Sequence, residues 1–362
     1  MDILLTTFPQ NKSKNVGDNL ITQSTLELIR SRVSNYQPHI VFREKPLNGY
    51  SKKKVKNIIA PGFSVSNNVY PELFTLYEDL GRLKNFFPIG CSFQHISPSI
   101  DAFNTAYNKK TLDFLKLIVD ISGPLPCRDQ LIVNMLNDRL NIPAIYSGDM
   151  AIYDEKVVNT TFNPPTVINS VVVTIQHHLK YLEQSIILLK TIKKEFPHAK
   201  LFIAYHSTPG YMPLTVASRA QQLGFEILHQ YGEVGNLEFY KNIDLHIGYR
   251  LHGHIYFLRN RKPSILLVED ARSFGFAKTK GTSIGCFEAF SLKENDPCID
   301  VPSQVLDFVR QEINNGFESY YSVFNFIDEK YNAYIIPYFE SLSAQINKES
   351  GPLTSKVNDL VS

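Results

Sequence analysis

Short apolar runs alternate with amphipathic stretches along the first part of the chain. The runs have the length of strands, and several end in glycine or a Pro-Gly pair, which is typical of strand ends. Apolar residues between the runs recur at helical spacing. Because strands and helices alternate, we expect a parallel sheet with helices on both faces. The predicted strands are 3–5, 39–42, 56–60, 86–89 and 144–147, and the predicted helices are 20–33 and 129–140.

The same alternation restarts after a polar, proline-containing stretch. Asn159-Thr160-Thr161 and Pro164-Pro165 predict a linker. The run Val171 to Ile175 is almost entirely β-branched, which is typical of a strand buried on both faces. A second α/β unit should therefore follow the first. Its predicted elements are a helix at 181–196, a strand at 201–205, the end of a helix at 218–223, a strand at 225–228, a short helix at 237–241, a strand at 245–247 and a closing strand at 264–268.

This pattern predicts an α/β protein with two Rossmann-like domains and C-terminal helices. A chain of 362 residues is too long for one ordinary core, which also favours two domains. We expect the first domain over 1–160 and the second over 165–295. A tail over 300–362 should be helical and pack back on the first domain. Since ligands bind at the carboxyl ends of parallel strands, the active site should lie in a central cleft.

Composition excludes several classes of protein. Hydrophobic residues make up 43% and charged residues 20%, which is the balance of a globular chain. The net charge of +2 gives no reason to expect a nucleic-acid partner. The four cysteines have no metal-site spacing, so we expect no metal and a reducing compartment. The N-terminal apolar run is too short for a signal peptide, and no stretch has membrane-spanning length, so we expect a cytoplasmic protein.

One local basic cluster stands out, Lys52-Lys53-Lys54 followed by Lys56. A solvated entry to a strand accounts for it. The alternative is peripheral contact with anionic lipid or with a charged glycan.

The most informative segment is 247–254, where a predicted strand passes into a predicted helix. Arg250 and His252 lie at this junction. The free N–H groups of a helix start favour an anion, and arginine binds phosphate or carboxylate with two parallel hydrogen bonds. Gly248 and Gly253 leave room for a ligand, whereas His254 should face another side of the helix and pack. The alternative is that Arg250 pairs with a carboxylate and His252 caps the helix.

Further candidates follow the strands of the first domain. Asn15, Gly17 and Asp18 lie after the first strand, where Gly17 permits close backbone approach and Asp18 or Asn19 can cap the helix. This segment is a ligand site or an ordinary helix cap.

Two more positions flank the last strands of the first domain. Arg128 precedes a helix that Asp129 can cap, and it either points to the cleft or forms a structural salt bridge. Asp149, after the last strand, can order the cleft or pair with Arg128.

Histidines follow two strands of the second domain. His177 and His206 suit acid–base catalysis near neutral pH, although each is also compatible with an ordinary loop position. Cys91 ends a strand of the first domain, but no residue nearby in the sequence would activate it as a nucleophile.

Taken in order, these elements resemble the polysaccharide pyruvyl transferase family over roughly residues 1–290. The resemblance rests on NxGDxxI from Asn15, the RD pair at Arg128, the GD pair ending at Asp149, and RLHGHI from Arg250. It implies a two-domain fold similar to that of GT-B glycosyltransferases. It also implies transfer of a pyruvyl group from phosphoenolpyruvate (PEP) to two hydroxyls of a sugar in a polysaccharide or lipid-linked precursor, forming a ketal.

The resemblance also implies roles for particular residues. It puts Arg250, Leu251 and His252 at PEP-binding and catalytic positions, and Arg128 at a PEP-binding one. The second domain would then be the PEP side and the first domain the acceptor side. Two departures from the family pattern are Tyr249, where many members have a small residue, and Arg272, where a lysine is common.

The implied chemistry fits the candidate residues. Two arginines and a helix start would hold the two anionic groups of PEP. His252 would act as the general acid, and the base for the sugar hydroxyl is left open among Asp18, Asp149 and His177. PEP is a co-substrate, and no cofactor is expected. The alternatives are a GT-B glycosyltransferase, in which Glu269 and Asp270 hold the ribose of a nucleotide sugar, and an inactive sugar-binding relative.

Overall fold

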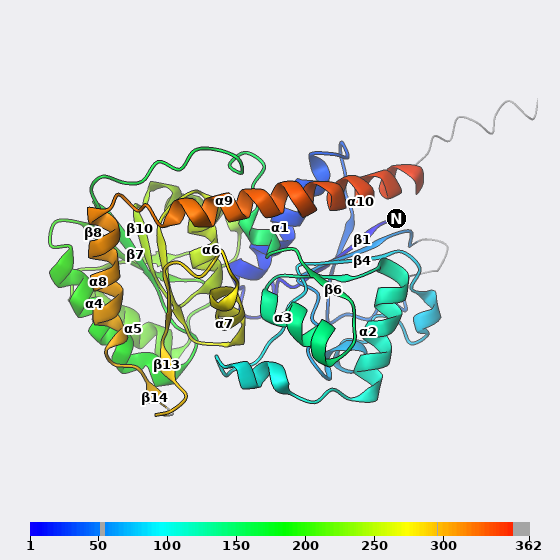
Figure 1. Cartoon of the computed structure of the whole chain (residues 1–362), viewed down its shortest axis with the longest axis horizontal. Helices are drawn as coiled ribbons and strands as arrows, with labels where there is room; N and C mark the ends of the chain where they lie inside the picture. The colour runs from blue at the N-terminus through cyan, green and yellow to red at the C-terminus, as the bar shows by residue number, and fades with distance from the viewer. Residues whose placement is uncertain (51–54, 295, 350–362) are drawn as a thin grey trace, which may run out of the picture.

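The structure, a computed structural model, describes residues 1–50, 55–294 and 296–349. The lysines at 52–54 therefore lie outside the described residues. Two sheets lie side by side, and a long helical segment near the end of the chain crosses from one to the other (Figure 1).

The first sheet has the order β2-β1-β3-β4, and every neighbouring pair is parallel. β5 and β6 form a parallel pair that continues from β4 through a bridge between Cys91 and Cys127. β5 was not predicted, because its sequence Leu-Pro-Cys is short and proline is a poor strand signal. The strands are β1 (Ile3–Thr6), β2 (His39–Phe42), β3 (Ile58–Pro61), β4 (Phe86–Ile89), β5 (Leu125–Cys127) and β6 (Ala144–Tyr146).

The helices of this half depart from the predictions in two places. The predicted helix 129–140 is a short helix, α3, that continues as a π-helical turn, η4, and α2 was not predicted at all. The α-helices are α1 (Val16–Arg30), α2 (Lys109–Ser122) and α3 (Gln130–Asn134), and the shorter helical turns are η1 (Val69–Leu73), η2 (Leu80–Arg82), η3 (Ile100–Asn104), η4 (Met135–Arg139) and η5 (Met150–Ile152).

The second sheet is parallel throughout, in the order β12-β11-β10-β7-β8-β9. Read from β9, this is the doubly wound order in which the strand sequence reverses between β7 and β10. The prediction that 264–268 closes the sheet is wrong, because β12, too short to give a periodic signal, pairs outside β11. The strands are β7 (Ser170–Thr174), β8 (Lys200–Tyr205), β9 (Glu226–His229), β10 (Leu245–Gly248), β11 (Ser264–Val268) and β12 (Cys286–Glu288).

Helices cover both faces of this sheet. Val172 belongs to the core shared with the first half, whereas its neighbours Val171 and Val173 belong to the core on the other face, so β7 is buried on both sides. A small hairpin of β13 (Phe290–Ser291) and β14 (Asp296–Pro297) follows β12. The helices are η6 (Leu179–Tyr181), α4 (Leu182–Glu195), α5 (Tyr211–Gln222), η7 (Val234–Asn242), α6 (Leu251–Arg259), α7 (Ala271–Lys278) and α8 (Val301–Asn314).

The C-terminal helices join the two halves. α9 (Tyr320–Lys330), η8 (Tyr331–Ile335) and α10 (Ile336–Glu349) follow one another in a single rod that runs over the first sheet (Figure 1). Phe339 and Leu342 of α10 are buried in the shared core, and Tyr338 donates a hydrogen bond to the carbonyl of Pro88 at 2.9 Å.

The predicted fold class is confirmed: an α/β chain with two parallel sheets in Rossmann-like units, and C-terminal helices. In the part of the chain that the structure describes, none of the helices combines the length and apolar character needed to cross a bilayer.

Candidate active site at the carboxyl ends of the two sheets

Arg250 lies where the strand order of the second sheet reverses. It follows β10 and is the N-cap residue of α6, and its backbone N–H donates to Thr174 Oγ1 at the end of β7, at 3.2 Å. A Cβ atom at Gly248 would come within 2.3 Å of the Thr174 side chain, so the two strand ends approach this closely only because residue 248 is glycine. The fold thus places Arg250 at the usual ligand-binding edge of a doubly wound sheet.

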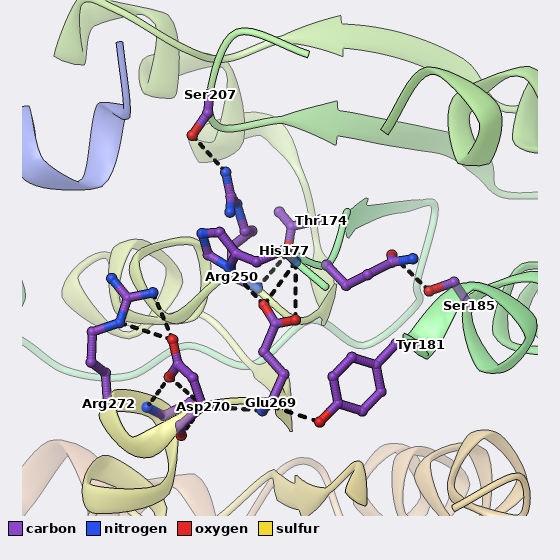
Figure 2. A network of polar contacts seen from close by, with 11 residues as sticks. Thr174, His177, Tyr181, Ser185, Ser207, Arg250, Glu269, Asp270 and Arg272 are labelled. Carbon is purple, nitrogen blue, oxygen red and sulfur yellow. Dashed lines mark hydrogen bonds and ion pairs between the residues drawn. The ribbon is translucent and has the colours of Figure 1, made fainter. Parts of the chain in front are cut away.

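The guanidinium of Arg250 is buried, with 8% of the residue exposed. Its Nη2 donates to Ser207 Oγ at 2.7 Å (Figure 2). Burial lowers the pKa of Arg250 to about 10, although Glu269 and Asp18 oppose this effect, so the group remains a cation at neutral pH. Within the described residues Arg250 forms no ion pair shorter than 4 Å. The alternative prediction, that Arg250 pairs with a carboxylate, is therefore wrong.

Glu269 holds His177 beside Arg250 (Figure 2). Its carboxylate accepts from the backbone N–H of His177 at 3.0 Å and contacts Nδ1 of the same residue at 2.7 Å. Burial raises the pKa of Glu269 to about 7, and Asp270 adds to the rise. The His177 side chain is about one-third exposed, so one face of the ring is open to the cleft.

Asp270 holds Arg272 at the start of α7. Its Oδ1 caps the helix by accepting from the Ser273 N–H at 2.9 Å, and its Oδ2 accepts from Arg272 Nε and Nη2 at 2.9 and 2.6 Å. Burial by itself would raise the pKa of Asp270, but the charges of Arg272 and His177 and the hydrogen bonds from Ser273 and Arg272 together outweigh it and hold the pKa below its usual range. Both carboxylates that the glycosyltransferase alternative assigned to a ribose are thus engaged with protein groups.

His252 meets Asp149 across the cleft between the two halves. Its Nε2 lies 3.4 Å from Asp149 Oδ2, and both residues are buried. Burial alone would raise the pKa of Asp149, but His252 and Arg128 outweigh it and lower the pKa, so Asp149 is ionised at neutral pH. Its Oδ1 accepts from the Ala151 N–H at 2.9 Å, which fixes the carboxylate at the start of η5.

The first turn of α1 closes over His252. A Cβ atom at Gly17 would lie 2.3 Å from His252 Nδ1, so the ring packs directly on the Gly17 backbone. The prediction that Asp18 or Asn19 caps α1 is wrong, because the helix begins earlier and Asn15 accepts from the Gly17 N–H at 3.1 Å. The second half holds this turn in place, since the Val16 N–H donates to the His206 carbonyl at 3.0 Å.

Arg128 is a buried guanidinium with unpaired donors. Its contacts with Asp149 and Asp129 are long, at 3.8 and 3.9 Å, and its Nε and Nη2 have no hydrogen-bond partner in the described structure. Burial lowers the pKa of Arg128 against the opposing charges of Asp149 and Asp129. Buried N–H donors are costly when unpaired, so an anion that reached them would be stabilised, but both atoms are enclosed and Arg128 does not line the space at Arg250. Asp129 caps α3, as predicted, through the Ile132 N–H at 2.9 Å.

The family is decided by sequence comparison. The sequence model of the polysaccharide pyruvyl transferase family matches residues 15–270, which is more than half of the chain. The chain belongs to this family. The match begins at Asn15 and ends at Asp270, so it contains every candidate residue described above except Arg272.

Similar solved structures are distant from this pyruvyl transferase family member. UDP-GlcNAc 2-epimerase from Neisseria meningitidis has 10% identity and a TM-score of 0.46, over 90% of this chain and 94% of that chain. The E. coli heptosyltransferase WaaC has 12% identity and a TM-score of 0.40, over 86% and 100%. Accessory secretory protein 1, 2 and 3 in Streptococcus pneumoniae has 10% identity and a TM-score of 0.40, and the match covers 80% of this chain but only 54% of that chain. No curated protein sequence matches the chain.

Two further histidines near the site, His206 and His254, have structural partners. His206 is buried and joined to the Tyr240 hydroxyl at 2.8 Å, and burial, with Arg250 and His252, lowers its pKa well below the usual value. His254 is fully buried and bonded to Ser264 Oγ at 2.8 Å. His254 is therefore not placed to exchange protons with solvent, whereas His206, although buried, borders the space at Arg250.

The fold brings the sequence candidates close together. His252 contacts Gly17 and lies near Asp149, Asp149 lies near Arg128, and the charge of Asp18 acts on Arg250. Arg272, which the sequence singled out only as a departure, lines the same narrow space and was missed as a site residue because its position depends on tertiary packing. The lining of this space is Asn15, His177, His206, Arg250, Leu251, His252 and Arg272.

Proposed function

We propose that this family member transfers a pyruvyl group from PEP to two hydroxyls of a sugar, which forms a cyclic ketal. The observation that carries the proposal is the pair of buried guanidinium groups, Arg250 and Arg128, without a carboxylate in hydrogen-bonding distance among the described residues. PEP carries a phosphate and a carboxylate, and each can accept two parallel hydrogen bonds from an arginine. Arg272, beside Arg250, adds a third positive charge.

The proposed reaction balances without a redox partner. One sugar hydroxyl oxygen bonds to C2 of PEP while C3 gains a proton and becomes a methyl group. The bond between C2 and the phosphate oxygen then breaks, and inorganic phosphate leaves with the electron pair. A second hydroxyl oxygen bonds to C2 and closes the ketal. One hydroxyl proton balances the proton that C3 gained, and the other leaves with the phosphate.

We assign the general acid to His252. Its Nε2 faces the ionised Asp149, which would orient the ring and stabilise the imidazolium, as a carboxylate does for a catalytic histidine elsewhere. Nδ1, which lies beside the Gly17 backbone, is then the nitrogen that we expect to exchange a proton with PEP.

The general base we assign to His177. Asp149 already faces His252 and Arg128. The charge of Asp18 favours the cationic forms of Arg250 and Arg272. His177, in contrast, lines the cavity, and its Nδ1 is held by Glu269. Its Nε2 is the atom left to accept a hydroxyl proton.

The first prediction concerns PEP binding and is tested by thermal melting. We expect PEP to raise the melting temperature of the wild type, because a ligand that binds only the native state stabilises it, by about 2.7 kcal/mol at a hundredfold excess over Kd. Arg250→Ala should abolish this rise, and UDP should have no effect on either protein. Arg310→Ala is the matched control, since Arg310 is exposed on α8 and does not line the space at Arg250. A rise with UDP and none with PEP would make the protein a nucleotide-sugar enzyme instead.

The role of His252 is tested by measuring both the PEP-dependent rise in melting temperature and the rate of phosphate release. His252→Ala should keep the PEP-dependent rise and lose phosphate release by about 100- to 10,000-fold, the usual contribution of a positioned acid or base. Normal phosphate release by the variant would remove His252 from the chemistry.

A further inference from the structure

A cavity of about 550 Å³ lies beside Arg250, between the ends of β7 and β8 and the segment that leads into α1. It narrows at Asn15, His177, His206 and Arg250 into the space that also borders His252 and Arg272. Pockets for small-molecule ligands are about 300–1000 Å³, and PEP alone would leave much of this volume unfilled. The wide part of the cavity therefore has room for a second molecule.

The walls of the wide part differ from those of the neck. Positive charge is confined to the neck, at Arg250, and none of the described residues that line the cavity is acidic. Elsewhere the wall combines the neutral polar groups of Gln176, Ser207 and Thr208 with the apolar surfaces of Tyr205 and Met212. Such a mixture suits an uncharged ring that has apolar C–H faces and hydroxyl groups at its edge.

Gln176 offers an unused donor to that ring. The residue is 2% exposed, and its Oε1 accepts from Ser185 Oγ at 2.7 Å. Its Nε2 has no hydrogen-bond partner in the described structure and is enclosed, although the residue lines the cavity, so the amide must turn toward the cavity to donate to a ligand. A buried amide N–H that lacks a protein partner is unfavourable, and a ligand hydroxyl oxygen would satisfy it.

Tyr211 stands at the mouth of the cavity. It is the first residue of α5 and lines the cavity, yet 86% of it is exposed. An aromatic ring with so little protein contact is available to pack against the face of a ligand ring.

We propose that this cavity binds the acceptor, with one neutral sugar ring between Tyr211 and Gln176 and its reacting hydroxyls toward the neck. The inference rests on the proposed function, because it takes PEP to bind at Arg250, in the part of the cavity next to the neck; the space beyond the neck, about 10 Å³, is too small for PEP. His177, in the wall of both spaces, then faces the hydroxyls that must lose protons. The acceptor would thus lie on the second half of the chain, rather than on the first half as the family resemblance implied.

The test measures sugar binding and PEP binding separately in the same proteins. Saturation-transfer NMR with methyl glucoside, methyl galactoside and methyl mannoside, in the presence of PEP, measures glycoside binding. Thermal melting with PEP alone measures PEP binding at Arg250. The variants are Tyr211→Ala and Gln176→Leu. Leu214→Ala is the matched control, since Leu214 is also exposed on α5, at 52%, but does not line the cavity.

We expect at least one glycoside to bind the wild type. Gln176→Leu should weaken that binding by about 2- to 12-fold, the usual effect of one hydrogen bond, and Tyr211→Ala by a similar factor, while Leu214→Ala leaves it unchanged. The PEP-dependent rise in melting temperature should be the same in all four proteins. If binding is equal in all four proteins, or no glycoside binds the wild type, the sugar subsite is wrong. If glycosides behave as expected but PEP never shifts melting, the donor assignment fails and the subsite stands.

Discussion

At the scale of single residues, the site depends on contacts that tolerate no extra atom. Gly17→Ala would place a methyl group 2.3 Å from His252 Nδ1, so the imidazole would have to move. We expect turnover to fall by about 100-fold, the typical cost of a displacement near 1 Å, and stability to fall by about 1–3 kcal/mol through overpacking. Gly235→Ala is the control, because a Cβ there meets nothing within 4 Å. Steady-state kinetics and urea unfolding measure both effects, and wild-type turnover in Gly17→Ala would show that the packing on His252 is irrelevant to catalysis.

A second prediction at this scale concerns pH and Glu269. Its pKa rises from 4.5 to about 7 on folding, so between these values the folded protein binds a proton that the unfolded chain has released. Stability contributed by Glu269 is therefore lost as pH rises from about 4.5 to 7, by about 3 kcal/mol at most. Glu269→Gln removes this dependence, and the difference between its stability and that of the wild type, from urea unfolding at pH 5 to 8, should change with pH in this direction. A difference that stays constant with pH would contradict the raised pKa.

At the scale of elements, α6 has site residues at its N-terminal end, Arg250 and His252, and a buried structural arginine, Arg259, at its C-terminal end. Arg259, in its last turn, is buried and donates to Ser24 Oγ at 2.8 Å and to the carbonyl of Tyr153. It also meets Asp154 at 3.1 Å. One side chain of the second half therefore holds both α1 and the segment just after Asp149, and so sets the position of Asp149 relative to His252.

Substitution of Arg259 tests this connection. Arg259→Met removes a buried charge whose partners stay behind, so we expect a loss of stability of about 3–5 kcal/mol. Arg259→Lys keeps the charge but cannot reach all the partners, and its turnover should fall about tenfold or more at a temperature where it is folded, with little change in the KM for PEP. Arg310→Met, at an exposed arginine of α8, is the control for kinetics and unfolding. Unchanged turnover in Arg259→Lys would show that Arg259 supports the fold without positioning Asp149.

At the scale of the whole molecule, the two halves share one continuous core. Residues of the first sheet, of α6 and of α10 belong to the same buried cluster, and the Ala271 N–H of α7 donates to the His95 carbonyl of the first half at 3.0 Å. Figure 1 shows the α9–α10 rod lying across both halves. Because the carboxyl ends of both sheets face this joint, groups from distant parts of the sequence form one site there.

The sequence alone determined most of the elements and the family. Periods of two and of 3.6 residues in apolar positions are local properties, so the buried β7 strand and most helices could be predicted from neighbours in the chain. The junction at Arg250 could be predicted in the same way, because a strand that passes into a helix leaves free N–H groups at a known place. The prediction failed where the local signal was short, as in β5 and β12, and it also missed the 14-residue helix α2.

Only the tertiary structure decided which candidates lie together. Three contacts join segments that are remote in sequence. His252 contacts Asp149, Glu269 binds His177, and Arg272 lies beside Arg250. No periodicity encodes such pairs, since they arise from the order of strands in each sheet and from the way the two halves pack. Burial, which leaves Arg128 with unpaired donors and shifts the pKa of Glu269, is likewise a property of the packed molecule, because it depends on the loss of water around each group.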